Sequence, residues 1–339
     1  MVCVDGKQMR IIDGHVHIWD KYHGVRYGSV VPKSLGYGKI ELNGVVEKLL
    51  PPSFVDNRAS AEILLGYMND NGVDGAVVLQ NPCYGDQKEY VAAAMERWPD
   101  RFVATMGKVD PRDTKHILDT IDVLVKSFKC KGIKIEVPDV PFWMDDPEYA
   151  PMWEKVIEDD LICVLDLGFE DSEYDWNIER LANLLHRYPN IRMRLPHLGI
   201  SRLWDKSQRY PYPELQKMLK LFDINRDNLT ADFSAMPFYD PDADYPDVRN
   251  QKILKVVYEV VGSKKLIWGS DFPTILKLRT MKQCIDFVTK KCDFLTFEDK
   301  QNIMCGNVTR ELRLDWSQMS LHPPPAHALL VGDINCSKL

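Results

Sequence analysis

Two histidines separated by one residue, His15 and His17, end an apolar segment near the start of the chain. If that segment is a β-strand, its period of two places both imidazoles on one face. Two neutral imidazoles on one face can share a metal ion or bind one substrate oxygen. The alternative is a pair of half-buried structural histidines, and the spacing alone does not decide between the two.

Asp271 and His197 extend this pair, because each also ends an apolar segment. Asp271 lies in GSDFP and could accept a proton from water as a general base. It could also be a turn or N-cap aspartate before Pro273. His197 lies in LPHLG and could polarise a carbonyl group or bind a metal ion, although an isolated histidine is more often a core residue.

Eight short apolar segments alternate with amphipathic ones along the chain, which predicts alternating strands and helices. Three of the amphipathic stretches, 87–102, 175–189 and 278–288, have apolar residues at helical spacing. The strands are expected at 10–18, 75–80, 102–108, 131–137, 161–168, 191–197, 228–234 and 265–271.

Strict alternation of this kind predicts a parallel sheet, and eight units favour a closed (β/α)8 TIM barrel in one domain. An open doubly wound sheet is the alternative, but no glycine fingerprint follows the first strand. In a closed barrel the eighth strand lies beside the first, and catalysis takes place at the carboxyl ends of the strands. We therefore expect His15, His17, His197 and Asp271 to converge in one pocket there.

Two stretches depart from the regular alternation. Residues 19–57 separate the first strand from its helix, and so long a segment in a compact domain is usually functional. We expect it to cover the catalytic face, with Arg26, together with Tyr84 after the second strand, as candidate substrate contacts. Residues 317–339 have no periodic pattern and are expected to be a C-terminal extension, loosely ordered, beyond a barrel of residues 1–316.

Composition restricts the class of protein. The net charge of -7 and the pI near 5.7 argue against nucleic acid or an anionic membrane as a partner. No apolar stretch approaches the ~18–20 residues of a membrane span. The first ten residues contain no apolar signal segment, and the 8 cysteines form no C-x-x-C pair. We expect free thiols, a cytoplasmic location and a small-molecule substrate, with a homodimer as the first guess for the oligomeric state.

The motifs DGHVHIWD, PHLG and GSDFP, in this order, resemble those of the amidohydrolase superfamily. The resemblance is to the amidohydrolase-related branch, which holds lactonases and non-oxidative decarboxylases, and it covers about residues 10–315. It implies that His15 and His17 match the first-strand histidine pair of this branch. By the same resemblance, His197 matches the sixth-strand histidine and Asp271 the catalytic or metal-binding aspartate.

One position departs from the metal-dependent members of the branch. Its decarboxylases carry a histidine ligand at the end of the fifth strand, where this chain has LDLG, with Asp166 nearest. The pattern is therefore more similar to the sugar-lactonase and pyrone-dicarboxylate-lactonase group, in which that histidine is absent and a metal need not be required. Asp166 could replace the ligand, since carboxylate oxygen suits zinc or manganese. The more ordinary expectation pairs it with Arg192 or Arg194 on the next strand.

Lys134, in the fourth-strand segment GIKIE, has several interpretations. Some superfamily members carry a carbamylated lysine here that bridges two metals, but two metals would also need the missing fifth-strand histidine. A contact to a substrate anion, or a salt bridge to Glu136 or another neighbour, is expected instead.

Three functions remain open at this point. The first is hydrolysis of a small lactone, or less readily an amide, in which Asp271 takes a proton from water and His15, His17 and His197 polarise the carbonyl. One divalent ion, zinc or manganese, could be held by His15, His17 and Asp271, and catalysis without a metal is also open. The second is divalent-metal-dependent, non-oxidative decarboxylation of an aromatic or unsaturated acid. The third is a barrel that has lost catalysis and acts as a binding or scaffold protein.

Overall fold

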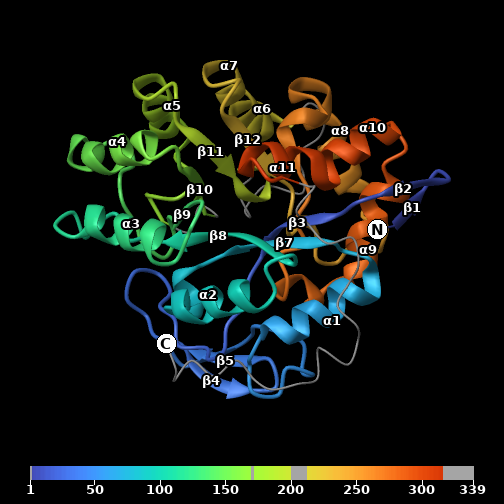
Figure 1. Cartoon of the computed structure of the whole chain (residues 1–339), viewed down its shortest axis with the longest axis horizontal. Coiled ribbons are helices and arrows are strands. Elements are labelled where there is room, and N and C mark those ends of the chain that lie inside the picture. Colours follow the sequence, from blue (N-terminus) through green and yellow to red (C-terminus); the bar gives the residue numbers. More distant parts are fainter. Residues whose placement is uncertain (1, 169–171, 200–211, 316–339) are drawn as a thin grey trace.

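A barrel of parallel strands forms the centre of the computed structural model, which describes residues 2–168, 172–199 and 212–315 (Figure 1). Its strand order is β13-β12-β11-β10-β9-β8-β7-β3. Each strand lies within a predicted range, so the (β/α)8 fold is confirmed. The strands are β3 (Ile12–Val16), β7 (Gly75–Leu79), β8 (Phe102–Lys108), β9 (Gly132–Glu136), β10 (Ile162–Asp166), β11 (Arg192–Leu195), β12 (Leu229–Asp232) and β13 (Leu266–Ile267).

The first and last strands of the barrel, β3 and β13, close on one another. Gly14 N donates to Trp268 O at 3.0 Å, and His17 N donates to Phe272 O at 2.8 Å. Only glycine fits at Gly14 and Gly269, because a Cβ at either position would lie 2.5 Å from a side-chain atom of the opposite strand. The closure places the end of the eighth strand beside the histidine pair.

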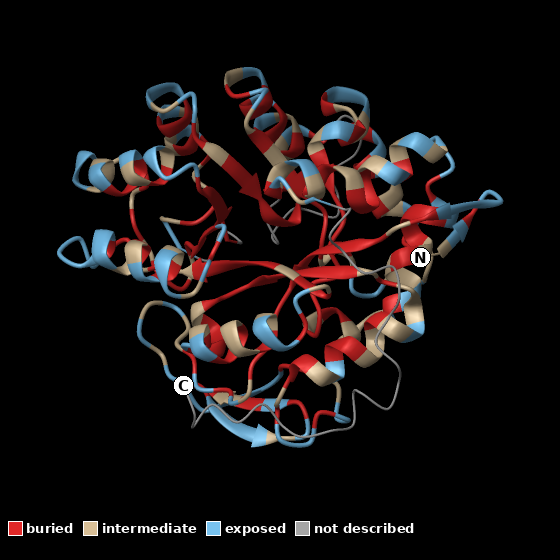
Figure 2. Cartoon of the chain, viewed as in Figure 1, coloured by how far each residue is buried: buried red, intermediate tan, exposed pale blue. Residues whose placement is uncertain are grey.

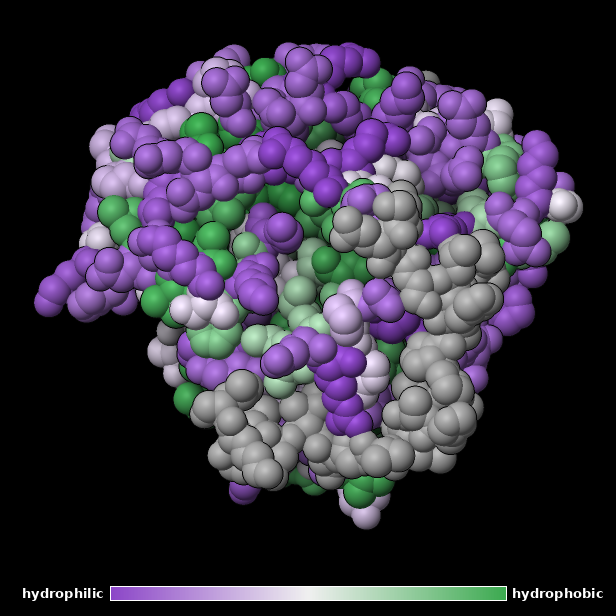
Figure 3. Space-filling view, viewed as in Figure 1, coloured by the Kyte–Doolittle hydropathy of each residue, from purple (hydrophilic) through white to green (hydrophobic). Residues whose placement is uncertain are grey.

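Helices form the outer layer around the barrel (Figure 1). Figure 2 shows that the barrel strands are buried while the helices expose their outward sides. On the same face, hydrophobic side chains lie in a central hollow and the surrounding surface is mostly hydrophilic (Figure 3). The helices are α1 (Ala61–Asn71), α2 (Lys88–Arg97), α3 (Ile117–Lys126), α4 (Ala150–Glu158), α5 (Ile178–Arg187), α6 (Pro213–Leu219), α7 (Leu221–Ile224), α8 (Val248–Val261), α9 (Met281–Asp286), α10 (Phe297–Gln301) and α11 (Asn307–Leu312).

The predicted helical stretches correspond to α2, α5 and α9, and α5 illustrates why they form. The Asn177 side chain caps its first turn by accepting from Arg180 N at 3.2 Å. The helix ends shortly before Pro189, which cannot continue it. Its apolar side chains face the barrel, and burying each contributes about 1.5–3 kcal/mol. They are Ile178, Leu181, Leu184 and Leu185.

The sequence analysis missed two small antiparallel sheets outside the barrel. The hairpin β1 (Val2–Val4) and β2 (Lys7–Met9) turns at Asp5 and Gly6, both with positive φ, as tight hairpin turns require. The segment 19–57, expected as a loop, contains a three-stranded sheet whose short strands are mostly exposed and lack regular alternation. These strands are β4 (Lys33–Gly36), β5 (Lys39–Leu42) and β6 (Val45–Lys48).

Three further expectations concern the chain as a whole. No helix within the described ranges is long and apolar enough to cross a membrane. The cysteines of the described residues are free thiols, as expected. The expected C-terminal extension, 317–339, lies outside the described residues.

Candidate active site

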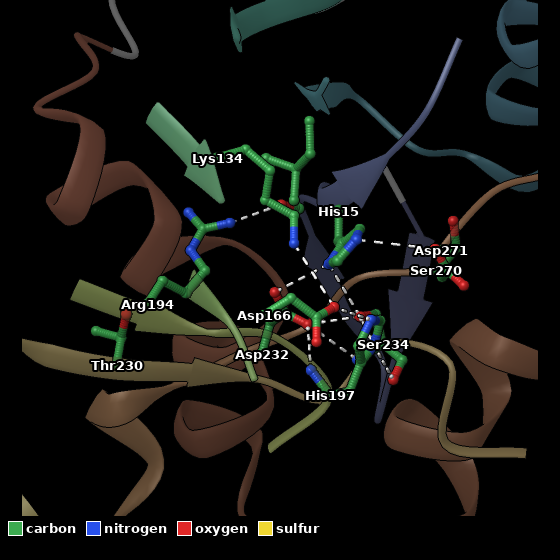
Figure 4. Close-up of polar contacts among 12 residues, drawn as sticks. His15, Lys134, Asp166, Arg194, His197, Thr230, Asp232, Ser234, Ser270 and Asp271 are labelled. Atoms are coloured by element: carbon green, nitrogen blue, oxygen red, sulfur yellow. Dashed lines mark hydrogen bonds and ion pairs between the residues drawn. The ribbon is translucent and has the colours of Figure 1, made fainter. Parts of the chain in front are cut away.

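His15, His17, His197 and Asp271 come together at the carboxyl ends of the barrel strands, where the sequence analysis expects them. Figure 4 labels three of them, His15, His197 and Asp271. His17 Nε2 lies 3.2 Å from His15 Nε2 and 3.2 Å from Asp271 Oδ1. His15 Nε2 lies 3.7 Å from the same carboxylate oxygen, and the rings of His15 and His197 are 5.0 Å apart. All four side chains line a cavity of about 230 Å³.

The backbone turns sharply at two of these residues. Asp271 and His197 have φ values of 61° and 55°, in the left-handed region that costs a residue with a side chain ~1–3 kcal/mol. Hydrogen bonds hold both turns: Asp271 N donates to His15 O at 2.9 Å, and His197 N donates to Asp232 Oδ1 at 3.2 Å. This backbone conformation is unfavourable in free energy, and it directs both side chains into the cavity.

Hydrogen bonds at Nδ1 indicate the tautomers of the histidine pair. His17 Nδ1 lies 2.7 Å from Leu79 O, which can only accept, so Nδ1 carries a proton. His15 Nδ1 lies 3.1 Å from Asp232 Oδ2 and is likewise the donor. Burial lowers the pKa of His15 to about 4, against the opposing charge of Asp232, so its Nε2 has a free lone pair near neutral pH. His15 Nε2, His17 Nε2 and Asp271 Oδ1 therefore need a positive charge among them, either a shared proton or a metal ion.

The same three atoms fit a divalent metal ion. Ligand atoms ~2.1 Å from a tetrahedral ion lie ~3.4 Å apart, close to the observed separations of 3.2, 3.2 and 3.7 Å. Among the described residues, a second group that could hold a metal is His15, His197 and Asp232, but it shares His15 with the first. Asp166, the weaker candidate ligand, belongs to neither group.

Asp166 pairs with residues other than those predicted. Its Oδ2 lies 3.3 Å from His197 Nε2 and 3.6 Å from Lys134 Nζ (Figure 4). The expectation of an ion pair with Arg192 or Arg194 is therefore wrong.

The ion pairs of the two arginines, one of them to helix α11, explain this correction. Arg194 pairs with Glu311 of α11 and also donates to Gly14 O at 2.7 Å. Thr230 Oγ1 donates to Glu311 Oε1 at 2.8 Å, which anchors that carboxylate. Arg192 pairs with Asp160 at 3.2 Å. Because other acceptors satisfy both arginines, Asp166 pairs with Lys134 and His197 instead.

His197 is a cation in this environment. Burial alone would lower its pKa, but the hydrogen bond and the charge of Asp166 raise it to about 10. Its Nδ1 lies 3.1 Å from Ser234 O, an acceptor, so both ring nitrogens are donors. Burial would raise the pKa of Asp166, but Lys134 and His197 hold it below its usual value. The result is a fixed imidazolium in the cavity.

Asp271 is ionised near neutral pH. Burial alone would raise the pKa of this carboxyl group, but a hydrogen bond with His17 and the charges of the neighbouring histidines lower it below 3.8. A carboxylate that lines a cavity beside an imidazolium can accept a proton from a bound molecule.

The candidate substrate contacts divide into two groups. Arg26 and Tyr84 line the cavity, and Tyr84 OH lies 3.1 Å from Thr274 Oγ1. Lys134 is not among the described residues that line the cavity, because its side chain is buried beneath it. Its Nζ lies 2.7 Å from Glu136 Oε2, the salt bridge named in the sequence analysis.

Segment 19–57 covers one side of the site. Besides Arg26 it contributes Tyr27, Ile40 and residues 47–49 to the cavity lining. Its position is the one expected of a cover over the catalytic face.

Sequence reasoning missed Asp232 and Ser234 at the end of β12. Ser234 Oγ donates to Asp232 Oδ1 at 2.5 Å and lies 3.0 Å and 2.9 Å from the Nδ1 atoms of His15 and His197. The two residues connect both imidazoles (Figure 4). The available signal was the segment ADFS, where two polar residues at a spacing of two end an apolar strand.

Comparison with known proteins identifies the family. A family model described as amidohydrolase matches residues 12–314. The chain belongs to the amidohydrolase family. This match confirms the resemblance carried by the three motifs. The family consists of enzymes that act on small molecules. An L-fucono-1,5-lactonase from Burkholderia ambifaria is 25% identical over 216 residues, which are 60% of this chain and 66%, just under two thirds, of the lactonase.

Solved amidohydrolase-like structures share the fold. A probable 2-pyrone-4,6-dicarboxylic acid hydrolase from Acinetobacter baumannii, with citric acid bound, has a TM-score of 0.66 and 18% identity, and the match covers 90% of this chain and 100% of that chain. A Burkholderia multivorans amidohydrolase with bound zinc has a TM-score of 0.66, 16% identity and the same coverage. A dihydroxybenzoic acid decarboxylase from Polaromonas with bound manganese and 2-nitroresorcinol has a TM-score of 0.56 and 15% identity, covering 76% of this chain and 88% of that chain.

Proposed function

We propose that this member of the amidohydrolase family hydrolyses a small lactone, with Asp271 as the general base. The observation that carries the proposal is the placement of an ionised Asp271, with Oδ1 3.2 Å from His17 Nε2, in the same cavity as the imidazolium of His197. A base and an opposing cation around one cavity are what attack of water on a carbonyl group requires.

In the proposed reaction, Asp271 takes a proton from water while the water oxygen attacks the carbonyl carbon of the lactone. The charged ring of His197 stabilises the negative charge that develops on the carbonyl oxygen. The ring C–O bond then breaks, and the proton on Asp271 passes to the leaving alkoxide to give a hydroxy acid. General-base catalysis of this kind typically contributes ~10²–10⁴-fold.

His15 and His17 provide the remaining polar surface of the reaction site. Their Nε2 atoms, with Asp271 Oδ1, would hold a zinc or manganese ion, since two imidazoles and a carboxylate suit either metal. When bound, such an ion supplies Lewis-acid polarisation of the carbonyl group.

Metal-dependent decarboxylation of an aromatic or unsaturated acid is the second candidate. The three-ligand geometry of His15, His17 and Asp271 favours it. The fifth-strand position argues against it, because Asp166 there is already paired with Lys134 and His197 and adds no ligand to the group. The balance of these observations favours the lactonase.

One assay separates the two reactions. The purified protein, with its metal content measured by elemental analysis, is incubated with a panel of sugar and aromatic lactones and with a panel of dihydroxybenzoic acids. We expect hydroxy acids from lactones and no carbon dioxide from the aromatic acids. Release of carbon dioxide from an aromatic acid, with no lactone opened above the uncatalysed rate, would overturn the proposal.

A further inference from the structure

Cationic side chains other than the imidazolium of His197 line the cavity. Arg26, Lys48 and Lys277 all line it, from segment 19–57 and from the 3-10 turn Thr274–Lys277 that follows Asp271. The proposed water attack uses none of the three. Glu47 and Asp271 line the same cavity, but among the described residues neither forms an ion pair with Lys277 or Arg26, so both cations keep donors for a negative partner.

Lys277 is a partly buried cation with few polar partners. Its Nζ makes one hydrogen bond, to Lys48 O at 3.3 Å, and lies 4.9 Å from the ring centre of Phe238, which also lines the cavity. It forms no ion pair with a carboxylate among the described residues. An ammonium has three donors, so at least two are available to a molecule in the cavity. Burial lowers the pKa of Lys277 to about 8; the charge of Asp271 opposes this shift, and the charges of Arg26 and Lys48 reinforce it.

Arg26 also has donors to spare. Its one ion pair in the described part of the chain joins Nε to Asp139 Oδ1 at 3.3 Å, and Asp139 Oδ1 also accepts from Tyr27 N at 3.0 Å. The terminal nitrogens of Arg26 donate to no described residue. A guanidinium presents these two nitrogens as a fork that matches the two oxygens of a carboxylate.

We infer that the lactone substrate carries a carboxylate, held by Lys277 and Arg26 while Asp271 and His197 act on its ring carbonyl. This inference rests on the proposed function and names its substrate class. A carboxylate there relieves the repulsion between the two cations and occupies their free donors. Arg26 belongs to the segment that covers the site, so the same contact would draw this segment onto the substrate.

Measurements of binding test the carboxylate site without requiring that the enzyme turn over a substrate. Calorimetry measures the affinity of glutarate and of its neutral counterpart glutaramide for the full-length protein and for three variants. We expect glutarate to bind and glutaramide not to bind. Lys277→Met should weaken glutarate binding roughly 10- to 100-fold, and Lys277→Arg should largely restore it. Lys264→Met is the matched control, because Lys264 is exposed just before β13, at the opposite end of the barrel, and should bind glutarate as the wild type does.

Glutarate binding that is absent, or equal in the wild type and folded Lys277→Met, overturns the inference. If Lys277→Met does not fold, by circular dichroism, Lys277→Gln takes its place.

Turnover then tests the two proposals separately. D-glucaro-1,4-lactone and D-glucono-1,4-lactone differ by a carboxylate in place of a hydroxymethyl group. We expect the wild type to prefer the first, and Lys277→Met to reduce the ratio of the two kcat/KM values roughly 10- to 100-fold. Opening of both lactones with no dependence on Lys277 would overturn the inference but not the lactonase. Lys277-dependent glutarate binding without any lactone opening would overturn the lactonase but not the anion site.

Discussion

The Nε2 atoms of His15 and His17 lie 3.2 Å apart, while the Nδ1 atom of each ring points to a hydrogen-bond acceptor. Two acceptor lone pairs do not approach so closely without a cation between them. Asp271 Oδ1 completes the group at 3.2 Å from His17. The surrounding residues therefore build a site that holds positive charge, and they do so through the hydrogen bonds that set the two tautomers.

Asp232 fixes one of those tautomers, and Asp232→Asn tests its role. We expect 10- to 100-fold loss of zinc affinity or of lactone hydrolysis, because removing the charge frees the His15 ring to rotate or change tautomer. Zinc titration with a competing chelator and steady-state kinetics measure the two effects. Asp227→Asn is the control, since Asp227 is exposed before the same strand. If Asp232→Asn keeps the zinc affinity and the hydrolysis rate of the wild type, the proposed role of Asp232 in positioning His15 is wrong.

Asp166 holds the positive charge of His197, and this gives a pH dependence. A raised pKa keeps the ring protonated until the pH rises through about 10, so activity that needs the imidazolium should persist to that pH. Without the hydrogen bond and charge of Asp166, burial lowers the pKa of His197, and only the charges of Asp271 and Asp232 still oppose that shift. In Asp166→Asn, we therefore expect the alkaline limb of the kcat/KM profile to move from about 10 to lower pH. An alkaline limb that stays in place, after subtraction of uncatalysed lactone opening, would contradict the role of His197.

The sequence identified the parts of the site that lie on single strands. His15, His17, His197 and Asp271 could be found because each ends an apolar run, and a parallel barrel brings such ends together. The partners of Asp166 could not be found in this way. Arg194 forms its ion pair with Glu311 of α11 instead, and nothing in local spacing reveals a contact across 117 positions.

In the fold, too, some elements could be predicted from the sequence and others could not. The eight barrel strands are short, mostly apolar segments whose burial decides their structure, and each lies where the sequence predicts it. The sheet β4–β6 was missed because its outer strands are exposed on both faces, so hydrophobic periodicity leaves no trace in the sequence.

Segment 19–57 should close over bound substrate. It lines the cavity through Arg26 and Tyr27, so a ligand that contacts these residues should stabilise the segment. Limited proteolysis, with cleavage sites mapped by mass spectrometry, should give slower cutting within 19–57 when a substrate or product is saturating. Cutting at exposed sites in α8 serves as the internal control. Equal cutting rates within 19–57, with and without ligand, would contradict a covering role.

Arg194 should matter for stability through Glu311. The guanidinium is fully buried, and Arg194→Met leaves the Glu311 carboxylate without its charge partner. Breaking a buried pair in this way costs ~3–5 kcal/mol, whereas an exposed pair contributes ~0–1 kcal/mol. We therefore expect Arg194→Met to lower the free energy of unfolding in urea by several times more than Arg313→Met, whose side chain is 69% exposed in its pair with Asp160. Similar losses for both variants would show that the buried pair adds little.

Asp271→Asn tests the central claim most directly. The amide is nearly isosteric with the carboxylate, but it cannot take a proton from water. The measurement is the rate of lactone opening per folded molecule, together with the unfolding midpoint of the same preparation. We predict a rate lowered by at least ~10²–10⁴-fold with the midpoint nearly unchanged. If Asp271 were only a turn or capping residue, the rate would stay near that of the wild type while stability fell by ~1 kcal/mol, and that result would contradict the account.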